Sequence, residues 1–276
     1  MSLDLASEPA EEGAGLSTRW MRLRQGVGDN LPVWGFVTLL LLIWQSADFV
    51  FGLPLYVLPP PTVILAKLIS SWALLLDNAM VTLVEVLFGF GASVGIGIPL
   101  AILIVYSRIF ERVAFPLMVS LQTIPKVALA PLLVMWLGYG LMPKITVAFL
   151  ISFFPIVINS VIGLRSTERE MIFLARSLGA SELTTFLKFR LPKALPSIFG
   201  GLKIGIGQAI VGATVGEFIA AERGLGYLQL ISQVRLDTPL LFAAVVVLSG
   251  LGVILFKVVA IVEKLALPWA QLRLED

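Results

Sequence analysis

The sequence predicts an all-α integral membrane protein, and two features lead to that fold class. Of the 276 residues, 58% are hydrophobic and only 14% are charged. A soluble domain carries about a quarter charged residues, because its surface must be wetted. The second feature is a series of apolar runs, each near the roughly 20 residues that a helix needs to cross the hydrocarbon core. Lipid is therefore the expected surrounding of most of this chain.

Six apolar runs reach this length, and each predicts one transmembrane helix, at about 32–52, 79–106, 113–138, 145–164, 196–220 and 239–262. The first run follows a long polar tail without a clear small-residue cleavage site, so we expect a retained anchor rather than a secretory signal. Between the first two runs, Pro59, Pro60 and Pro61 forbid a continuous helix. The short amphipathic stretch after them should lie at the membrane surface. A seventh span is the alternative, and Lys67 counts against it.

The distribution of Lys and Arg predicts the orientation, because cytoplasmic loops carry an excess of both. With the N-terminus in the cytoplasm, the outer side holds only Lys67, Lys144, Arg223 and Arg235. The cytoplasmic side then holds Arg19, Arg22, Arg24, Arg108, Arg112, Arg165, Arg169, Arg176, Lys188, Arg190, Lys193, Lys264 and Arg273. Both termini are therefore expected in the cytoplasm. Because the net charge is only +2 and the basic residues lie beside apolar spans, nucleic-acid binding is not expected.

Prolines and glycines distinguish three of the spans. The third contains Pro116, Pro125 and Pro131, so it must bend or break. Broken helices persist in lipid only where neighbours or a water-filled cavity satisfy the freed backbone groups. Spans two and five contain glycines spaced four apart, namely Gly91/Gly95, Gly201/Gly205 and Gly212/Gly216. Such small faces allow close packing of helices within one bundle.

The residue types that the sequence lacks limit its chemistry. Without Cys or His there is no disulfide, thiolate nucleophile or imidazole base. Neither GxSxG nor the phosphate-binding GxxxxGK[ST] occurs. We therefore expect no cofactor, metal or catalytic residue in this chain, and work that needs ATP would require another chain to hydrolyse it.

The one substantial cytoplasmic loop, residues 165–193, carries the clearest functional pattern. Thr167 and Glu170 fit a T-x-x-E capping box that would start a helix near Glu168. Gly179 is suited to the left-handed position that ends such a helix. The first half of the loop is therefore predicted to be a short helix followed by a sharp turn.

The second half of the loop predicts another short helix. Ser181 can cap it, and it should run to about Phe189 and close at Pro192. Several apolar residues would then face water on this loop: Met171, Phe173, Leu174 and Leu178. An amphipathic hairpin lying on anionic headgroups is the simpler alternative. The tightly specified turn and the direct connection to two membrane helices favour a docking role instead.

The loop resembles the coupling loop of ABC-importer permeases, whose pattern is EAA, three residues, Gly, nine residues, then I-x-LP. The matching positions are Ala175, Gly179, Phe189 in the Ile place, Leu191 and Pro192. Phe173 and Leu174 stand where the family has Glu and its first Ala, which indicates a more apolar groove on the partner. Further segments across about 55–265 resemble the nitrate/sulfonate/taurine-type branch: LPPPTVI, QTIPKVALAPLLVMWLGYGLMPKI, FFPIVINSVIGLRS and VGEFIAAERGLGYL.

This resemblance implies a type I ABC importer-like permease subunit in the bacterial inner membrane. It implies a homodimer, or a pair of close paralogues, with two ATPase subunits that bind ATP and Mg and a substrate-binding protein at the outer face. ATPase coupling would fall to Met171, Phe173, Leu174, Ala175, Arg176, Ser177, Leu178, Gly179, Ala180 and Ser181. The expected domains are a cytoplasmic tail (1–30), the first span with a periplasmic segment (31–78), the permease core (79–265) and a cytoplasmic tail (266–276).

Polar residues inside spans are candidates for the translocation path, because they are expensive there and often functional. They are Gln122, Lys126, Asn159, Ser160, Gln208 and Glu217, with Glu85 as a further case. Glu217 could instead bond a neighbouring helix or Lys203, and Glu85 could be solvated near the outer end. Lys126 could attract an anion, pair with a carboxylate or extend to water.

The substrate stays open among the solutes that the branch carries. These are sulfonates, taurine, nitrate, bicarbonate, thiamin-precursor pyrimidines, riboflavin and aromatic acids, and GYGLMPK in place of a GIGE-type turn favours the vitamin-precursor group. Two other classes compete. An ion-coupled secondary transporter would show inverted repeats, and none is evident. An intramembrane enzyme would need His, Cys or paired aspartates within spans, which the sequence lacks.

Overall fold

The computed structural model describes residues 31–52 and 54–271, and these residues form helices joined by short turns. The chain divides into two compact units, Met1–Val63 and Ile64–Asp276. The predicted tails at 1–30 and 272–276 lie outside the described residues. An all-α architecture is confirmed for the part of the chain that the structure covers.

The first unit contains α2 (Leu31–Phe51), which coincides with the first predicted span. The chain then turns at 54–60, and α3 (Pro61–Ser70) begins at the last of the three prolines. Gln45 fixes this connection, because its side chain accepts from the Thr62 backbone N–H at 3.2 Å and donates to the Thr62 hydroxyl at 3.1 Å. With only 10 residues, α3 is too short to cross a bilayer, so it forms no seventh span.

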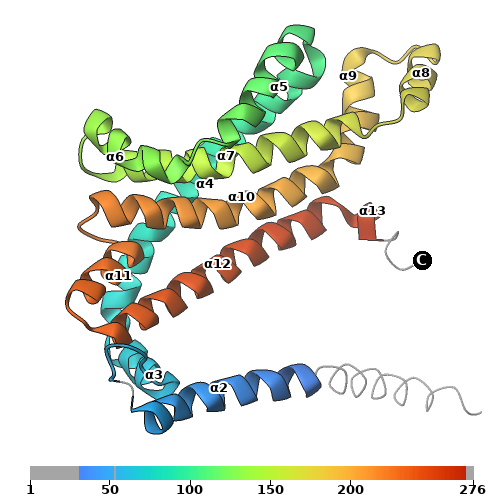
Figure 1. The fold of residues 1–276 in the computed structure, drawn as a ribbon. Coiled ribbons are helices and arrows are strands. Elements are labelled where there is room, and N and C mark those ends of the chain that lie inside the picture. Colours follow the sequence, from blue (N-terminus) through green and yellow to red (C-terminus); the bar gives the residue numbers. More distant parts are fainter. Residues whose placement is uncertain (1–30, 53, 272–276) are drawn as a thin grey trace, which may run out of the picture. The chain divides into compact units, whose positions relative to one another are not determined.

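Four long helices dominate the second unit: α4 (Trp72–Tyr106), α7 (Leu141–Arg165), α10 (Leu191–Ala220) and α12 (Thr238–Ala266) (Figure 1). Each is long and apolar enough to cross a membrane, and a bent helix pair brings the number of candidate spans among the described residues to five. The apolar part of α2, Gly35–Ala47, falls short of that length. The six-span prediction is therefore not confirmed in full.

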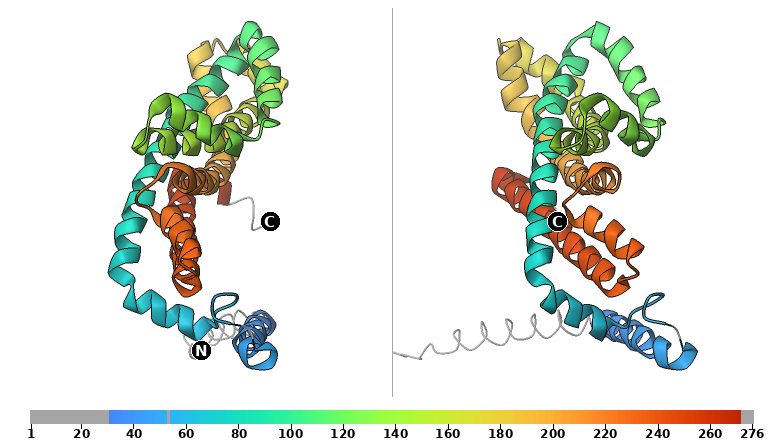
Figure 2. Two further views of the ribbon diagram at one scale, coloured as in Figure 1. Left: turned by 60° about the vertical axis from the view of Figure 1, so that its left-hand side comes forward. Right: turned by 90° about the vertical axis from the view of Figure 1, so that its left-hand side faces the viewer.

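The third predicted span is broken, as its prolines require. Its halves are α5 (Arg108–Gln122) and α6 (Lys126–Leu137), whose axes differ by 99° (Figure 2). The break falls at Pro125, which has no N–H to donate and disfavours a helical conformation in the residue before it. Pro116 and Pro131 lie inside the two helices instead.

Close packing of α7 against α10 forms the centre of the unit. A Cβ added to Gly201, Gly205, Gly212 or Gly216 would collide with α7, so these glycines let the two backbones approach as predicted. Gly91 and Gly95 meet no atom within 4 Å. The close approach of α4 to α7 occurs at Gly89 and Gly97 instead.

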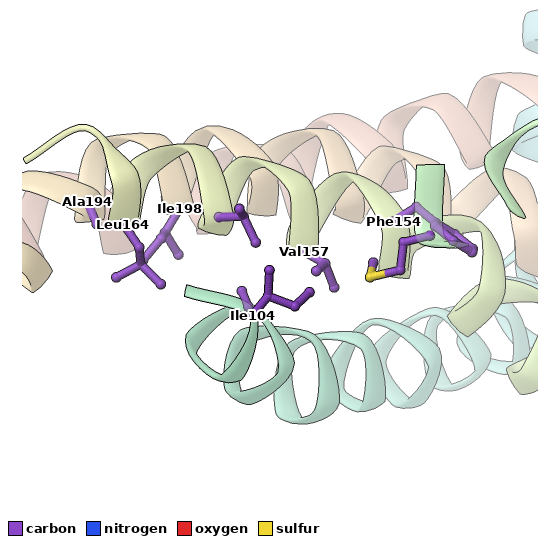
Figure 3. Close-up of a cluster of buried hydrophobic side chains, with 9 residues drawn as sticks. Ile104, Phe154, Val157, Leu164, Ala194 and Ile198 are labelled. Carbon is purple, nitrogen blue, oxygen red and sulfur yellow. The ribbon is translucent and has the colours of Figure 1, made fainter. Parts of the chain in front are cut away.

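An apolar cluster holds α4 and α5 against the α7–α10 pair. It includes Ile104 of α4, Val157 and Leu164 of α7, and Ile198 of α10, all nearly inaccessible (Figure 3). After α10 the chain forms α11 (Leu225–Val234), α12 and the short α13 (Pro268–Gln271). The helices α8 and α9 lie at one end of α7 and α10, and α11 lies at the other end (Figure 1).

Candidate functional site: a helical hairpin between two spans

The loop between α7 and α10 forms a helical hairpin, which consists of α8 (Arg169–Ser177), α9 (Glu182–Thr185) and a π-helical turn (Phe186–Arg190). Its first helix does not begin with the predicted capping box. Glu168 is the N-cap, and no side chain caps the helix. The Thr167 side chain is buried and its hydroxyl has no hydrogen-bond partner among the described residues, so it does not reach the free N–H groups of α8.

Gly179 ends the first helix, as predicted. Its φ of +79° is the left-handed conformation that glycine adopts at little cost. The Gly179 N–H donates to the Arg176 carbonyl at 2.9 Å, and the Ala180 N–H donates to the Ala175 carbonyl at 3.0 Å. These two bonds are the Schellman motif of a glycine-terminated helix.

Ser181 caps the second helix, because its hydroxyl accepts from the Thr184 backbone N–H at 3.2 Å. The turn is also bridged by the Arg176–Glu182 ion pair at 2.5 Å. The helix does not close at Pro192, however. Helical backbone continues through the π turn into α10, so residues Glu182–Ala220 form one uninterrupted helix. The wider π turn accommodates Pro192, which cannot donate a backbone hydrogen bond.

Contacts with the membrane helices position the hairpin. The Lys193 ammonium lies 2.7 Å from a Glu168 carboxylate oxygen, which joins the start of α8 to the start of α10 and lowers the pKa of Glu168. Tyr106, at the end of α4, packs edge to face against Phe186 with ring centres 5.9 Å apart. The Arg190 guanidinium lies 5.0 Å from the centre of the Tyr106 ring.

The hairpin presents apolar side chains outward. Phe173 is 63% exposed, Leu174 61% and Leu178 78%. Ala175 faces inward and is buried, whereas the other predicted coupling residues, Met171, Arg176, Ser177, Gly179 and Ser181, are exposed and Ala180 is half-buried. Exposed leucine and phenylalanine side chains of this kind mark a surface that contacts another protein or the membrane.

At the opposite end of the unit, side chains of α4 hold the start of α11. The Asn78 side-chain oxygen accepts from the Gly224 backbone N–H at 2.8 Å. The Thr82 hydroxyl accepts from the Leu225 backbone N–H at 2.9 Å. Asn78 and Thr82 are both buried. They satisfy backbone donors at a helix start that would otherwise lack partners.

Glu217 completes this arrangement from α10. One carboxylate oxygen accepts from the Thr82 hydroxyl at 2.6 Å, and the other accepts from the backbone N–H groups of Gly226 and, at 3.3 Å, Tyr227. The side chain is fully buried. Asn78, Thr82 and Glu217 are called the α11 clasp below. Sequence reasoning missed Asn78 and Thr82, although polar residues at 78, 82 and 85 recur on one face of an otherwise apolar helix.

Four other charged residues of the long helices form two pairs that the sequence left open. Glu85 is fully buried and pairs with Lys144 of α7, so the alternative that Glu85 is solvated near the outer end does not hold. Lys203 pairs with Glu263 of α12 at 2.5 Å, not with Glu217. These pairs join α4 to α7 and α10 to α12 in a medium where lone charges are costly.

The other path candidates divide into two groups. Asn159 and Ser160 donate to carbonyls of their own helix, Pro155 at 2.8 Å and Ile156 at 2.7 Å. Gln122 and Gln208 are exposed, and Lys126 is half-buried. The described residues contain no cluster of His, Cys, Asp or Glu that could hold a metal ion.

The chain is similar to a known protein family and to several known proteins. The family described as "Binding-protein-dependent transport system inner membrane component" matches residues 93–266. The formylaminopyrimidine transport permease ThiX of Halalkalibacterium halodurans is 37% identical over 85% of this chain and 94% of its own length. The riboflavin transport permease RibX of Chloroflexus aurantiacus is 37% identical over 87% of this chain and 90% of its own length.

Two further similarities extend the comparison. The taurine transport permease TauC of Escherichia coli is 30% identical over 92% of this chain and 94% of its own length. A structure of the inward-facing MetNI methionine ABC transporter shares the fold, with a TM-score of 0.61 and 18% identity over 71% of this chain and 97% of that one. The chain therefore belongs to the binding-protein-dependent transport system inner membrane component family, and it is a permease subunit of an ABC importer.

Proposed function

We propose that this permease couples to separate ATPase subunits through the hairpin Arg169–Arg190, with Phe173, Leu174 and Leu178 entering an apolar groove on the ATPase. The outward exposure of these three side chains is the observation that carries the proposal. Because the helix from Glu182 to Ala220 is uninterrupted, a displacement of the hairpin would be transmitted directly along α10.

The proposed assembly is a homodimer of this chain with two ATPase subunits, which hold ATP and Mg, and a binding protein on the outer face. Both termini lie in the cytoplasm in this proposal. The concentration of Lys and Arg on one side of the spans supports that orientation. ATP and the loaded binding protein would both favour the outward-open state, since each must bind one state better than the other to shift the equilibrium.

For the solute, we propose a vitamin or vitamin precursor of the formylaminopyrimidine or riboflavin kind. The permeases named for these solutes are each 37% identical to this chain, against 30% for the taurine permease. Calorimetric titration of the cognate binding protein with riboflavin, formylaminopyrimidine and taurine tests this choice. Tight binding of taurine alone would contradict it.

Gly179 provides a test of the coupling role. Space is not limiting there, because a Cβ at Gly179 would meet nothing within 4 Å, but its φ of +79° disfavours a β-branched residue. We expect Gly179→Val to lower solute uptake at least tenfold in proteoliposomes that contain the ATPase and binding protein, while the chain stays in the membrane. Gly179→Asn is the matched control, since asparagine tolerates the left-handed conformation, and it should retain most of the uptake. Normal uptake by Gly179→Val would overturn the assignment.

A further inference from the structure

Lys126 is the first residue of α6 and follows the break between α5 and α6 directly. Its ammonium is 4.6 Å from the centre of the Phe154 ring. Phe154 is about midway along α7, which runs from Leu141 to Arg165. Because α7 crosses the membrane, the ammonium lies near the mid-depth of that span. A lysine at mid-depth cannot reach the headgroups by extending its side chain, as lysines near helix ends do.

The charge of Lys126 is not balanced within the described residues. Lys144 pairs with Glu85 and Lys203 pairs with Glu263, but no ion pair joins Lys126 to a described carboxylate. Its ammonium donates only a long hydrogen bond, to the Gln122 carbonyl at 3.5 Å, among the described residues. The face of the Phe154 ring attracts a cation, yet more weakly than a carboxylate would. The Lys126 ammonium can therefore still bind an oxygen acceptor of another molecule.

We infer that Lys126, with the exposed side chain of Gln122, forms a mid-membrane subsite that holds an acceptor oxygen of the transported solute. This inference rests on the proposed importer function and concerns the permease's own contact with its cargo. An ammonium has three donors, so the Gln122 carbonyl leaves two for the solute. The ligand is a small molecule with a sulfonate, carboxylate or ring-carbonyl oxygen, since each presents negative charge to the ammonium.

Two general features of membrane transport support this position. An ionisable residue inside the bilayer that is not paired within the protein is a default candidate for a solute route, because its cost is not recovered by an ion pair. Transport sites also lie near the midplane where helices are discontinuous, since irregular backbone persists there only beside protein or a water-filled cavity. At the break between Gln122 and Lys126, a cation lies beside a discontinuous helix near the mid-depth of the membrane.

Thiol labelling tests whether Lys126 faces an aqueous route. The chain has no cysteine, so Lys126→Cys introduces its single thiol. In the assembled complex we expect this thiol to react with 2-aminoethyl methanethiosulfonate at least tenfold faster than the thiol of Val253→Cys, which lies near the middle of the apolar span α12. The rate should differ between the nucleotide-free complex and the complex with a non-hydrolysable ATP analogue. Equal, slow labelling of both cysteines in both states would overturn the inference.

Chemical rescue tests whether the positive charge matters. Riboflavin, formylaminopyrimidine and taurine are supplied in turn with the binding protein, and the solute that the wild-type complex carries becomes the probe. Lys126→Met and Lys126→Cys should lower its uptake at least tenfold, and the aminoethyl reagent, which adds an ammonium to the cysteine, should restore at least half of it. Methyl methanethiosulfonate should restore none.

Two controls separate this inference from failure of folding or of the proposed function. Lys126→Arg retains the charge and should keep uptake, and Lys257→Met removes an exposed lysine of α12 and should leave uptake unchanged. Uptake by Lys126→Met at the wild-type rate, or equal rescue by both reagents, contradicts the subsite. A wild-type complex whose ATPase does not respond to the loaded binding protein would instead count against the coupling proposal.

Discussion

At the scale of single residues, the buried polar side chains of the α11 clasp hydrogen-bond mainly to backbone groups rather than to one another. Glu217 accepts hydrogen bonds from backbone N–H groups at the start of α11. Asn78 and Thr82, which lie on α4, accept hydrogen bonds from backbone N–H groups of the same segment. An unsatisfied backbone donor in such a place would cost about 1–3 kcal/mol. The clasp therefore fixes the turn between α10 and α11, and both carboxylate oxygens of Glu217 accept hydrogen bonds inside the protein.

Gly224 makes the clasp testable at one position. Its φ is +122°, and a Cβ there would overlap the Glu217 carboxylate. A strained backbone conformation costs about 1–3 kcal/mol and overpacking a similar amount, so Gly224→Ala should destabilise the protein by about 2–6 kcal/mol. The measurement is the thermal midpoint of the detergent-solubilised complex.

The matched control for that substitution is Gly250→Ala on α12, where an added Cβ meets nothing within 4 Å. Its midpoint should stay unchanged or rise slightly, because alanine is the better helix former. An equal loss of stability in the two variants would show that the tight contact at Gly224 is not the cause.

Sequence reasoning could not reveal the clasp, because its partners lie far apart along the chain. Thr82 and Glu217 are separated by 135 positions. The isolated Glu217 in a hydrophobic run indicates a function or a partner but does not name which. The same distance effect explains why the sequence left the environment of Glu85 open, since its partner Lys144 belongs to another span.

At the scale of elements, helix boundaries were predicted well where the backbone chemistry of one residue requires them, and less well elsewhere. Gly179, Ser181 and Pro125 each mark a boundary that the backbone itself requires, and the structure places turns at all three. The start of α4 was missed by seven residues, at Trp72 rather than 79. Asp77 and Asn78 interrupt the apolar pattern there, although Asn78 is buried and satisfied by α11.

The cap of α9 permits a prediction for the hairpin. Loss of an N-cap hydroxyl costs about 1 kcal/mol, so Ser181→Ala should raise the population of the locally opened hairpin roughly fivefold. Limited trypsin digestion of the purified complex should cleave at Arg176 or Lys188 faster by about that factor, provided that reclosing outpaces cleavage.

Ser177→Ala is the control for that experiment. The Ser177 hydroxyl donates to the Phe173 carbonyl within α8 and caps no helix. Cleavage in this variant should match the wild type. If Ser181→Ala is cleaved no faster than Ser177→Ala, the hydroxyl does not stabilise the turn.

At the scale of the whole molecule, the second unit has two ends of different structure, joined by α7 and α10. The glycine faces of α10 bring these two helices into direct backbone contact. One end presents the exposed hairpin, and the other holds α11 through buried hydrogen bonds. Composition and the basic bias predicted a membrane protein with a cytoplasmic loop. The pairing of α7 with α10 depends on tertiary contacts, which single-sequence patterns do not specify.

The most direct test of the coupling proposal is a cross-link between the hairpin and the ATPase. Leu178 is 78% exposed at the tip of α8, and the chain has no native cysteine, so Leu178→Cys provides one defined thiol. With cysteines placed around the surface groove of the ATPase subunit, oxidation of the assembled complex should yield a cross-linked pair, and Val253→Cys on α12 should yield none. A cross-link from Val253→Cys but not from Leu178→Cys would contradict the assignment of the hairpin as the coupling element.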